Sequence, residues 1–268
     1  MNSAAPDPLV AIRSRIDAID EAMHELLIER SGVIDELIRI KGTARAGAAF
    51  RPEREAEMMR RIAVRHHGNL PLTAVEHIWR EIITTFTAMQ APFGVTVAPA
   101  IDPLALRDVV RFYFGFSVPV SPAESVEAAV ARVASPGNEL AIVPADVPGR
   151  WWTALFDPAG PKILAKLPFM DLPGRPAALP AYVVGPPLTN QPPPDVQVLA
   201  GPASAELAGA AISFGGRVAA TADGISLVEL PAGATPEDLG AAAGMRAAEL
   251  VACGGFAQPI RILAAKSS

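Results

Sequence analysis

Apolar residues in the first part of the chain recur every three or four positions, which is the spacing of a helix with one buried face. Asp7 followed by Pro8 is typical of a helix start, because aspartate caps the first turn and proline tolerates the first helical position. The pattern predicts a helix of roughly 35 residues, on the order of 50 Å long, that ends near Lys41. Its stripe consists of Leu9, Ile12, Ile16, Ile19, Met23, Leu26, Leu27, Ile34, Leu37 and Ile38.

Two shorter helices are predicted after the long one. Pro52 opens the first of them, which ends around His67, and Thr73 can cap the next, which runs to Gln90. A helix as long as the first cannot bury its stripe against two shorter helices alone. We therefore expect it to pair with a second copy of itself in an antiparallel homodimer.

The composition of the chain changes near residue 91. Charged residues are dense before this point, whereas proline, alanine, glycine and valine dominate after it. This change predicts an all-α domain over residues 1–91, followed by an α/β or α+β half that we divide into 92–195 and 196–268. We expect the pair Trp151-Trp152 in that half to belong to the core.

Strand and helix patterns alternate in this second half. Strands are predicted within 93–99, 138–146, 180–185, 196–201, 225–231 and 254–263, and helices within 102–115, 124–135, 204–215 and 236–250.

Charge and cysteine content exclude several function classes. The net charge of −5 and the pI near 5.4 argue against nucleic acid or an anionic membrane as the main partner. A single cysteine, Cys253, allows neither an intramolecular disulfide nor a thiolate metal cluster. The chain shows no signal-peptide pattern at its start and no run of 18 apolar residues, so we expect a cytoplasmic protein without a membrane helix.

Two cations lie on the apolar stripe of the long helix. Arg30 and Lys41 are 11 residues apart, which places them within roughly 20° of each other around the helix axis. Arg13 is rotated about 100° from Arg30, so it would reach the pocket of a partner subunit rather than its own. A cation that faces a core needs an anion. Arg30 could instead pair with a nearby acidic residue, and Lys41 could extend to solvent.

Further polar residues accompany these cations on the two shorter helices. Gln90 lies on the apolar face of the third predicted helix. Arg51, Arg54 and Glu55 lie together on one side of the first turn of the second. The set contains several cations, one amide and one carboxylate, without a nucleotide loop, a metal cluster or a catalytic triad. It suits a small dianion with two carboxylates, an ether oxygen and a hydroxyl group, and calls for no cofactor.

Residues 9–41, the segment FRPERE and the segment IWREIITTFTAMQ resemble the all-helical class of chorismate mutases. The resemblance is strongest to the mutase domain at the front of bifunctional chorismate mutase–prephenate dehydratases. It implies an intertwined three-helix homodimer that converts chorismate to prephenate in phenylalanine or tyrosine biosynthesis.

The resemblance also implies roles for individual residues. The carboxylate-binding arginines match Arg30 and, across the dimer, Arg13. Lys41 and Gln90 match the two groups at the ether oxygen. The remaining substrate contacts fall on the second helix, where Arg54 and Glu55 match an arginine and the glutamate that contacts the hydroxyl, and Arg51 is counted with them.

Two positions depart from the family pattern. Arg51 stands where better-known members carry an aspartate, and Phe86 where they carry a serine. The second half resembles a prephenate dehydratase with an ACT module only faintly, because the glycine-rich threonine/serine start and the Thr-Arg-Phe triplet are absent. This predicts a degenerate remnant with a structural or regulatory role.

Three other functions compete with a simple mutase. The chain could be a bifunctional mutase–dehydratase. It could be an isochorismate pyruvate lyase, which shares the helical fold and a similar cationic pocket. It could also be a non-catalytic dimerisation or binding protein, although a purely structural helix seam would favour leucine at the polar positions.

Overall fold

The computed structural model describes residues 7–41, 50–134, 138–188 and 192–262. The chain divides into two compact units, Met1–Arg45 and Ala46–Ser268. The ends of two predicted elements, residues 135 and 263, lie outside the described residues. No helix in the described ranges is both long enough and apolar enough to cross a membrane.

The first unit contains the helix α1 (Pro8–Lys41), as predicted from the apolar stripe. The carboxylate of Asp7 accepts a hydrogen bond from the backbone N–H of Leu9 at 3.0 Å, which satisfies one of the free donors of the first turn. Most of the stripe is exposed in the single chain, and Leu26, for example, has an exposed fraction of 63%. A continuous apolar surface of this length is characteristic of an interaction face.

The second unit begins with the helices α2 (Pro52–Arg65) and α3 (Leu72–Gln90). The prediction that α2 continues to His67 was wrong, because His66 already has an extended backbone. The prediction that Thr73 caps α3 was also wrong, because Pro71 is the N-cap and makes no side-chain cap. The carbonyl of Pro71 accepts the first helical hydrogen bonds, which places Thr73 inside the first turn.

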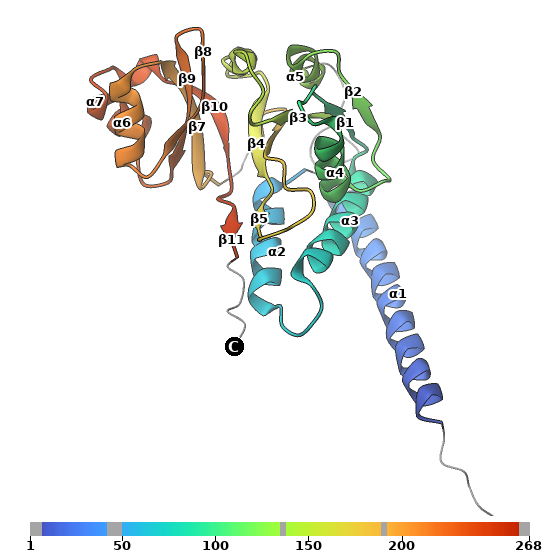
Figure 1. Ribbon diagram of the computed structural model, residues 1–268. Coiled ribbons are helices and arrows are strands. Elements are labelled where there is room, and N and C mark those ends of the chain that lie inside the picture. The colour runs from blue at the N-terminus through green and yellow to red at the C-terminus, as the bar shows by residue number, and fades with distance from the viewer. Residues whose placement is uncertain (1–6, 42–49, 135–137, 189–191, 263–268) are drawn as a thin grey trace, which may run out of the picture. The chain divides into compact units, whose positions relative to one another are not determined.

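The remaining chain forms a mixed nine-stranded sheet (Figure 1), with the strand order β2-β1-β3-β6-β4-β10-β7-β9-β8. β1 is parallel to both β2 and β3, and most other neighbours are antiparallel. Its strands are β1 (Gly94–Val97), β2 (Val120–Pro122), β3 (Glu139–Pro144), β4 (Lys162–Leu167), β6 (Ala181–Gly185), β7 (Val196–Pro202), β8 (Arg217–Ala222), β9 (Ile225–Pro231) and β10 (Val251–Phe256).

Figure 1 shows one pair of labelled helices, α4 (Pro103–Phe114) and α5 (Val126–Ala134), beside β1–β3, and another, α6 (Ala205–Ser213) and α7 (Pro236–Ala242), beside β7–β9. Two 3-10 turns, η1 (Trp151–Leu155) and η2 (Ala247–Glu249), and the parallel pair β5 (Met170–Asp171) with β11 (Ile260–Arg261) complete the fold. The predicted class, helices first and a mixed α/β half after them, is confirmed.

The sheet consists of a five-stranded part, β2-β1-β3-β6-β4, and a four-stranded part, β10-β7-β9-β8. The two parts join where β4 and β10 run parallel, with Gly254 opposite Ile163. The backbone of Gly254 has φ +122°, a conformation that residues with a side chain rarely adopt. A Cβ atom at this position would lie only 2.2 Å from the carbonyl oxygen of Ile163. A glycine at residue 254 is therefore a condition of the pairing.

One hydrophobic core connects the short helices with the sheet. Met59 of α2 and Ile83 of α3 pack in the same buried cluster as Val109 of α4 and Leu167 of β4. Trp151 and Trp152 are buried in a second cluster, at 2% and 0% exposure, which confirms their prediction as core residues. The domain limits at residues 91 and 195 stay predictions, because one core and one sheet run across them.

Candidate active site

Three of the predicted site residues lie on α1, in the first compact unit. Arg13 is exposed and Arg30 is half-buried. Lys41 is the last residue of α1, and its side chain lies outside the described part of the structure. All three residues thus lie on one continuous helix, as the sequence analysis assumed. That their side chains approach one ligand stays a prediction.

The other four predicted residues lie in the second unit, on α2 and α3. Arg51 is the N-cap residue of α2 and is half-buried, while Arg54 in the first turn is exposed. Gln90, the last residue of α3, donates from its side-chain amide to the carbonyl of Phe86 at 3.0 Å. Glu55 is directed into the protein, where it forms an ion pair.

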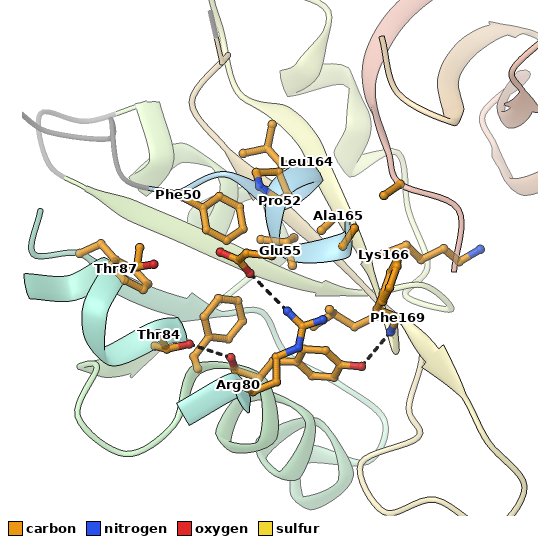
Figure 2. Close-up of a pocket in the computed structure, with 17 residues that line it drawn as sticks. Phe50, Pro52, Glu55, Arg80, Thr84, Thr87, Leu164, Ala165, Lys166 and Phe169 are labelled. Carbon is orange, nitrogen blue, oxygen red and sulfur yellow. Dashed lines mark hydrogen bonds and ion pairs between the residues drawn. The ribbon is translucent and has the colours of Figure 1, made fainter. Parts of the chain in front are cut away.

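Glu55 lies in a small cavity between α2, α3, α4 and β4, shown in Figure 2. Its carboxylate Oε2 lies 3.2 Å from Nη1 of Arg80, and the side chains are only 16% and 7% exposed. The guanidinium of Arg80 lies over the ring of Tyr113, 4.8 Å from its centroid. The cavity has a volume of about 40 Å³, which is room for water rather than for a ten-carbon acid.

Burial dominates the electrostatics of Glu55. It raises the pKa of this carboxyl to about 7, against the opposing effect of the Arg80 charge. Glu55 therefore changes charge near neutral pH, unlike an exposed glutamate.

A second buried ion pair continues this network. Nη1 of Arg175 lies 3.2 Å from Oε2 of Glu76. The hydroxyl of Tyr113 donates to Oε1 of Glu76 at 3.1 Å and accepts from the backbone N–H of Phe169 at 2.8 Å. Each of the two arginines thus faces a buried glutamate whose pKa is raised by burial, and the network ties α3 to the chain that follows residue 91.

The structure brings only one of the predicted residues of the second unit into this cavity. Glu55 lines it together with Arg80, Thr84, Thr87 and Lys166, whereas Arg51, Arg54 and Gln90 are absent from its wall. The sequence analysis missed Arg80 and the two threonines. Their signal was available, because positions 76, 80, 84 and 87 follow helical spacing and form a buried polar stripe on α3.

Residues 12–91 match the family model of chorismate mutase type II. The match begins in α1 and includes α2 and α3, so it spans all seven predicted site residues. The resemblance inferred from the sequence motifs is confirmed for this segment.

The similar curated proteins carry two activities in their names. The bifunctional chorismate mutase/prephenate dehydratase of Pseudomonas aeruginosa is 29% identical over 147 residues, which is 53% of this chain and 40% of that protein. The protein of the same name from Neisseria gonorrhoeae is 34% identical over 95 residues, or 35% of this chain and 25% of that one. The chain thus spans less than half the length of these relatives.

The first of these alignments is longer than the mutase segment, so similarity to the bifunctional proteins continues beyond residue 91. Among solved structures, a prephenate dehydratase from Arthrobacter aurescens in complex with L-Phe has a TM-score of 0.43 and 11% identity, over 62% of this chain and 90% of that one.

Proposed function

We propose that the protein is a chorismate mutase, an isomerase that rearranges chorismate to prephenate within one molecule. The observation that carries the proposal is the type II mutase match over residues 12–91. Five polar positions on three helices, Arg30, Lys41, Arg54, Glu55 and Gln90, support it, because they supply the groups that this substrate requires.

The chemistry of the reaction explains the residue types. One C–O bond breaks and one C–C bond forms, with no proton transfer and no covalent intermediate. An enzyme therefore contributes by holding the compact substrate geometry and by stabilising negative charge on the ether oxygen. Arginines would bind the carboxylates, and the ammonium of Lys41 and the amide of Gln90 would donate to the ether oxygen.

Gln90 has a donor left for this role. One N–H of its side-chain amide donates to the carbonyl of Phe86 within α3, and the second N–H of the same NH2 group would donate to the substrate. Glu55 would exchange part of its contact with Arg80 for the substrate hydroxyl, and the cavity beside it would have to widen.

The proposal includes a homodimer built on α1. The exposed apolar side chains of this helix, such as Ile16, Ile19 and Leu26, support it, since a second copy would cover them. The same pairing would bring the partner's Arg13 to a pocket that Arg30 and Lys41 enter from their own chain. We place the protein in the cytoplasm. Its single cysteine is consistent with this, because proteins in that compartment rarely depend on disulfide bonds.

A bifunctional mutase–dehydratase is the second candidate, favoured by the names of the relatives. The absence of the dehydratase sequence signatures argues against it. An isochorismate pyruvate lyase and a non-catalytic dimerisation protein remain alternatives from the sequence.

One assay separates these functions. The purified chain is incubated with chorismate, and the products are identified by liquid chromatography and mass spectrometry, with isochorismate in a parallel reaction. Prephenate alone is expected. Phenylpyruvate would establish the bifunctional enzyme, and pyruvate with salicylate from isochorismate would establish the lyase. Chorismate that decays only at the uncatalysed rate would refute the mutase.

A further inference from the structure

A second, larger cleft lies next to the cavity of Glu55 in the second compact unit, and Lys166 and Leu167 line both. It has a volume of about 490 Å³ and lies where the end of β4, the starts of β7 and β8, the end of β9 and the segment 256–261 meet. This volume is within the range of small-molecule sites, roughly 300–1,000 Å³, whereas the cavity beside Glu55 is far below it.

Glu229 is the centre of the charged wall of this cleft. The ammonium of Lys166 donates to both oxygens of the Glu229 carboxylate, at 2.8 Å each. Arg217 donates to the same carboxylate through Nε at 2.7 Å and through Nη2 at 2.9 Å. The hydroxyl of Tyr182 donates to it as well, at 2.5 Å. A carboxylate has about four lone-pair sites, so Glu229 has no capacity left for another donor.

With Lys166 and Arg217 both protonated, the cluster has one positive charge in excess; burial lowers the pKa of Lys166, and its hydrogen bond to Glu229 opposes that effect. Burial acts to raise the pKa of Glu229, but the hydrogen bonds from Arg217, Lys166 and Tyr182 outweigh it and hold that pKa below its ordinary value. Two cations thus share one anion. The other charged residues that line the cleft, Asp171 and Arg261, lie 3.9 Å apart at its exposed rim and balance each other.

Arg217 has donors left for a ligand. Its side chain is 52% exposed, in contrast to Glu229 at 8%. Among the described residues its guanidinium donates to Glu229 through Nε and Nη2, which leaves Nη1 for a further acceptor. A planar guanidinium is well suited to a carboxylate.

An apolar wall stands beside these cations. Val196 and Phe256 line the cleft and are buried at 3% and 2% exposure, and Leu167 joins them at 4%. The ammonium of Lys166 lies 5.5 Å from the centroid of the Phe256 ring, so the charged and apolar walls are adjacent. A ligand that fits both walls has one anionic group on a short apolar body.

We propose that this cleft is a binding site for a small organic monocarboxylate, with the carboxylate on Arg217 and the apolar body against Val196 and Phe256. The site is separate from the residues of the proposed mutase reaction. Its occupation would also cover the Lys166–Glu229 pair, which joins β4 to β9 across the sheet.

Phenylacetate serves as the probe, and phenylacetamide as its neutral isostere. Isothermal titration of the full-length chain is expected to give saturable binding of phenylacetate and at least about tenfold weaker binding of the amide. Arg217→Gln should weaken phenylacetate by about tenfold or more. The matched control is Arg246→Gln, since Arg246 is 84% exposed and, within the part of the chain that the structure describes, pairs with Glu249 of its own turn; it should bind like the wild type.

A second measurement locates the site without a substitution. The wild-type chain is photo-crosslinked with 4-benzoylbenzoate, and labelled peptides are identified by mass spectrometry. Labels are expected in residues 166–171, 196–197 or 256–261, and excess phenylacetate should suppress them. The proposal fails if phenylacetate does not saturate, if Arg217→Gln binds it as the wild type does, or if the labels lie only elsewhere. Chorismate turnover has no part in these readouts, so they separate this site from the mutase.

Discussion

Nη1 of Arg175 lies 3.2 Å from Oε2 of Glu76, with both side chains buried, at 2% and 0% exposure. The pair joins α3, within the segment that matches the mutase family, to a loop that follows β5. A buried ion pair of this kind contributes little net stability while it is intact, but it makes each partner dependent on the other.

Arg175→Met should therefore destabilise the protein strongly. It leaves the Glu76 carboxylate buried with Tyr113 and with the more distant charge of Arg80, and such losses cost about 3–5 kcal/mol. Urea denaturation followed by circular dichroism measures the effect. The matched control is Arg261→Met, because Arg261 is 80% exposed and its pair with Asp171 is long; its effect should stay within about 0.5 kcal/mol. Equal effects of the two substitutions would contradict the assigned role of Arg175.

Glu55 should make the folded state more stable as the pH falls from 7 towards 4.5. Burial raises the pKa of Glu55 in the folded chain to about 7, above its ordinary value of 4.5. Between these values the folded chain binds more protons than the unfolded chain, so a falling pH favours folding, and the contribution is lost as the pH rises through 7.

Comparison of the wild type with Glu55→Gln isolates this effect from other carboxyl groups. The difference in unfolding free energy, wild type minus variant, should be larger at pH 5 than at pH 8, by on the order of 2 kcal/mol. Glu57→Gln is the control on the same helix, since Glu57 is 56% exposed and its pair with Arg61 spans 3.9 Å. A difference for Glu55 that is the same at both pH values would show that this carboxyl titrates normally.

Lys41→Ala should reduce the rate of chorismate turnover by about two to three orders of magnitude, because one donor to the developing oxyanion is lost. The helical circular dichroism signal and the molecular mass should not change, since residue 41 is the last of α1. Arg39→Ala removes a nearby exposed cation of the same helix and should retain most of the activity. A Lys41→Ala protein with near wild-type kcat would remove Lys41 from the proposed mechanism.

Leu26→Glu should dissociate the proposed dimer. Leu26 is 63% exposed on the apolar stripe of α1, and a charge there would have to be buried against a second copy. Light scattering after size exclusion should give twice the chain mass of 28.0 kDa for the wild type and the single mass for the variant. Glu21→Lys, on the other side of the helix, should remain dimeric; a monomeric wild type would refute the dimer itself.

Helical periodicity made the first part of the fold predictable. The stripe from Leu9 to Ile38 predicted α1 to the residue at its end, because a single face repeated over many turns leaves little ambiguity. Periodicity fails at helix ends. The predicted helix 236–250 stops at Ala242, since Gly244 adopts φ +68° and the N–H of Met245 turns back to the carbonyl of Gly240 at 2.9 Å.

Strands with neither an apolar run nor an alternating pattern escaped prediction. β8 contains Arg217 and a series of small residues, and its faces are only partly buried, so neither an apolar run nor a period of two marks it. β2 also escaped prediction, because a strand of three residues is too short to show a pattern.

The candidate site was predictable in its residue types and less so in its contacts. Glu55 was identified, but its partner Arg80 is 25 residues away, and its cavity includes Lys166 from β4. Such pairs depend on packing between elements, which no single-helix pattern encodes. The same limit applies to Arg175 and Glu229, whose partners come from distant strands and helices.

The contact of Gly254 with Ile163 has a consequence for how the molecule unfolds. Only one register position links β4 to β10, so very few backbone hydrogen bonds cross from the five-stranded part to the four-stranded part. Side chains therefore have to hold the two parts together as the chain unfolds, among them the Lys166–Glu229 pair and the buried cluster that contains Ile163, Val198 and Phe256. The backbone junction itself requires glycine at position 254. The Cβ atom of an alanine there would collide with the backbone of Ile163 and push β4 and β10 apart.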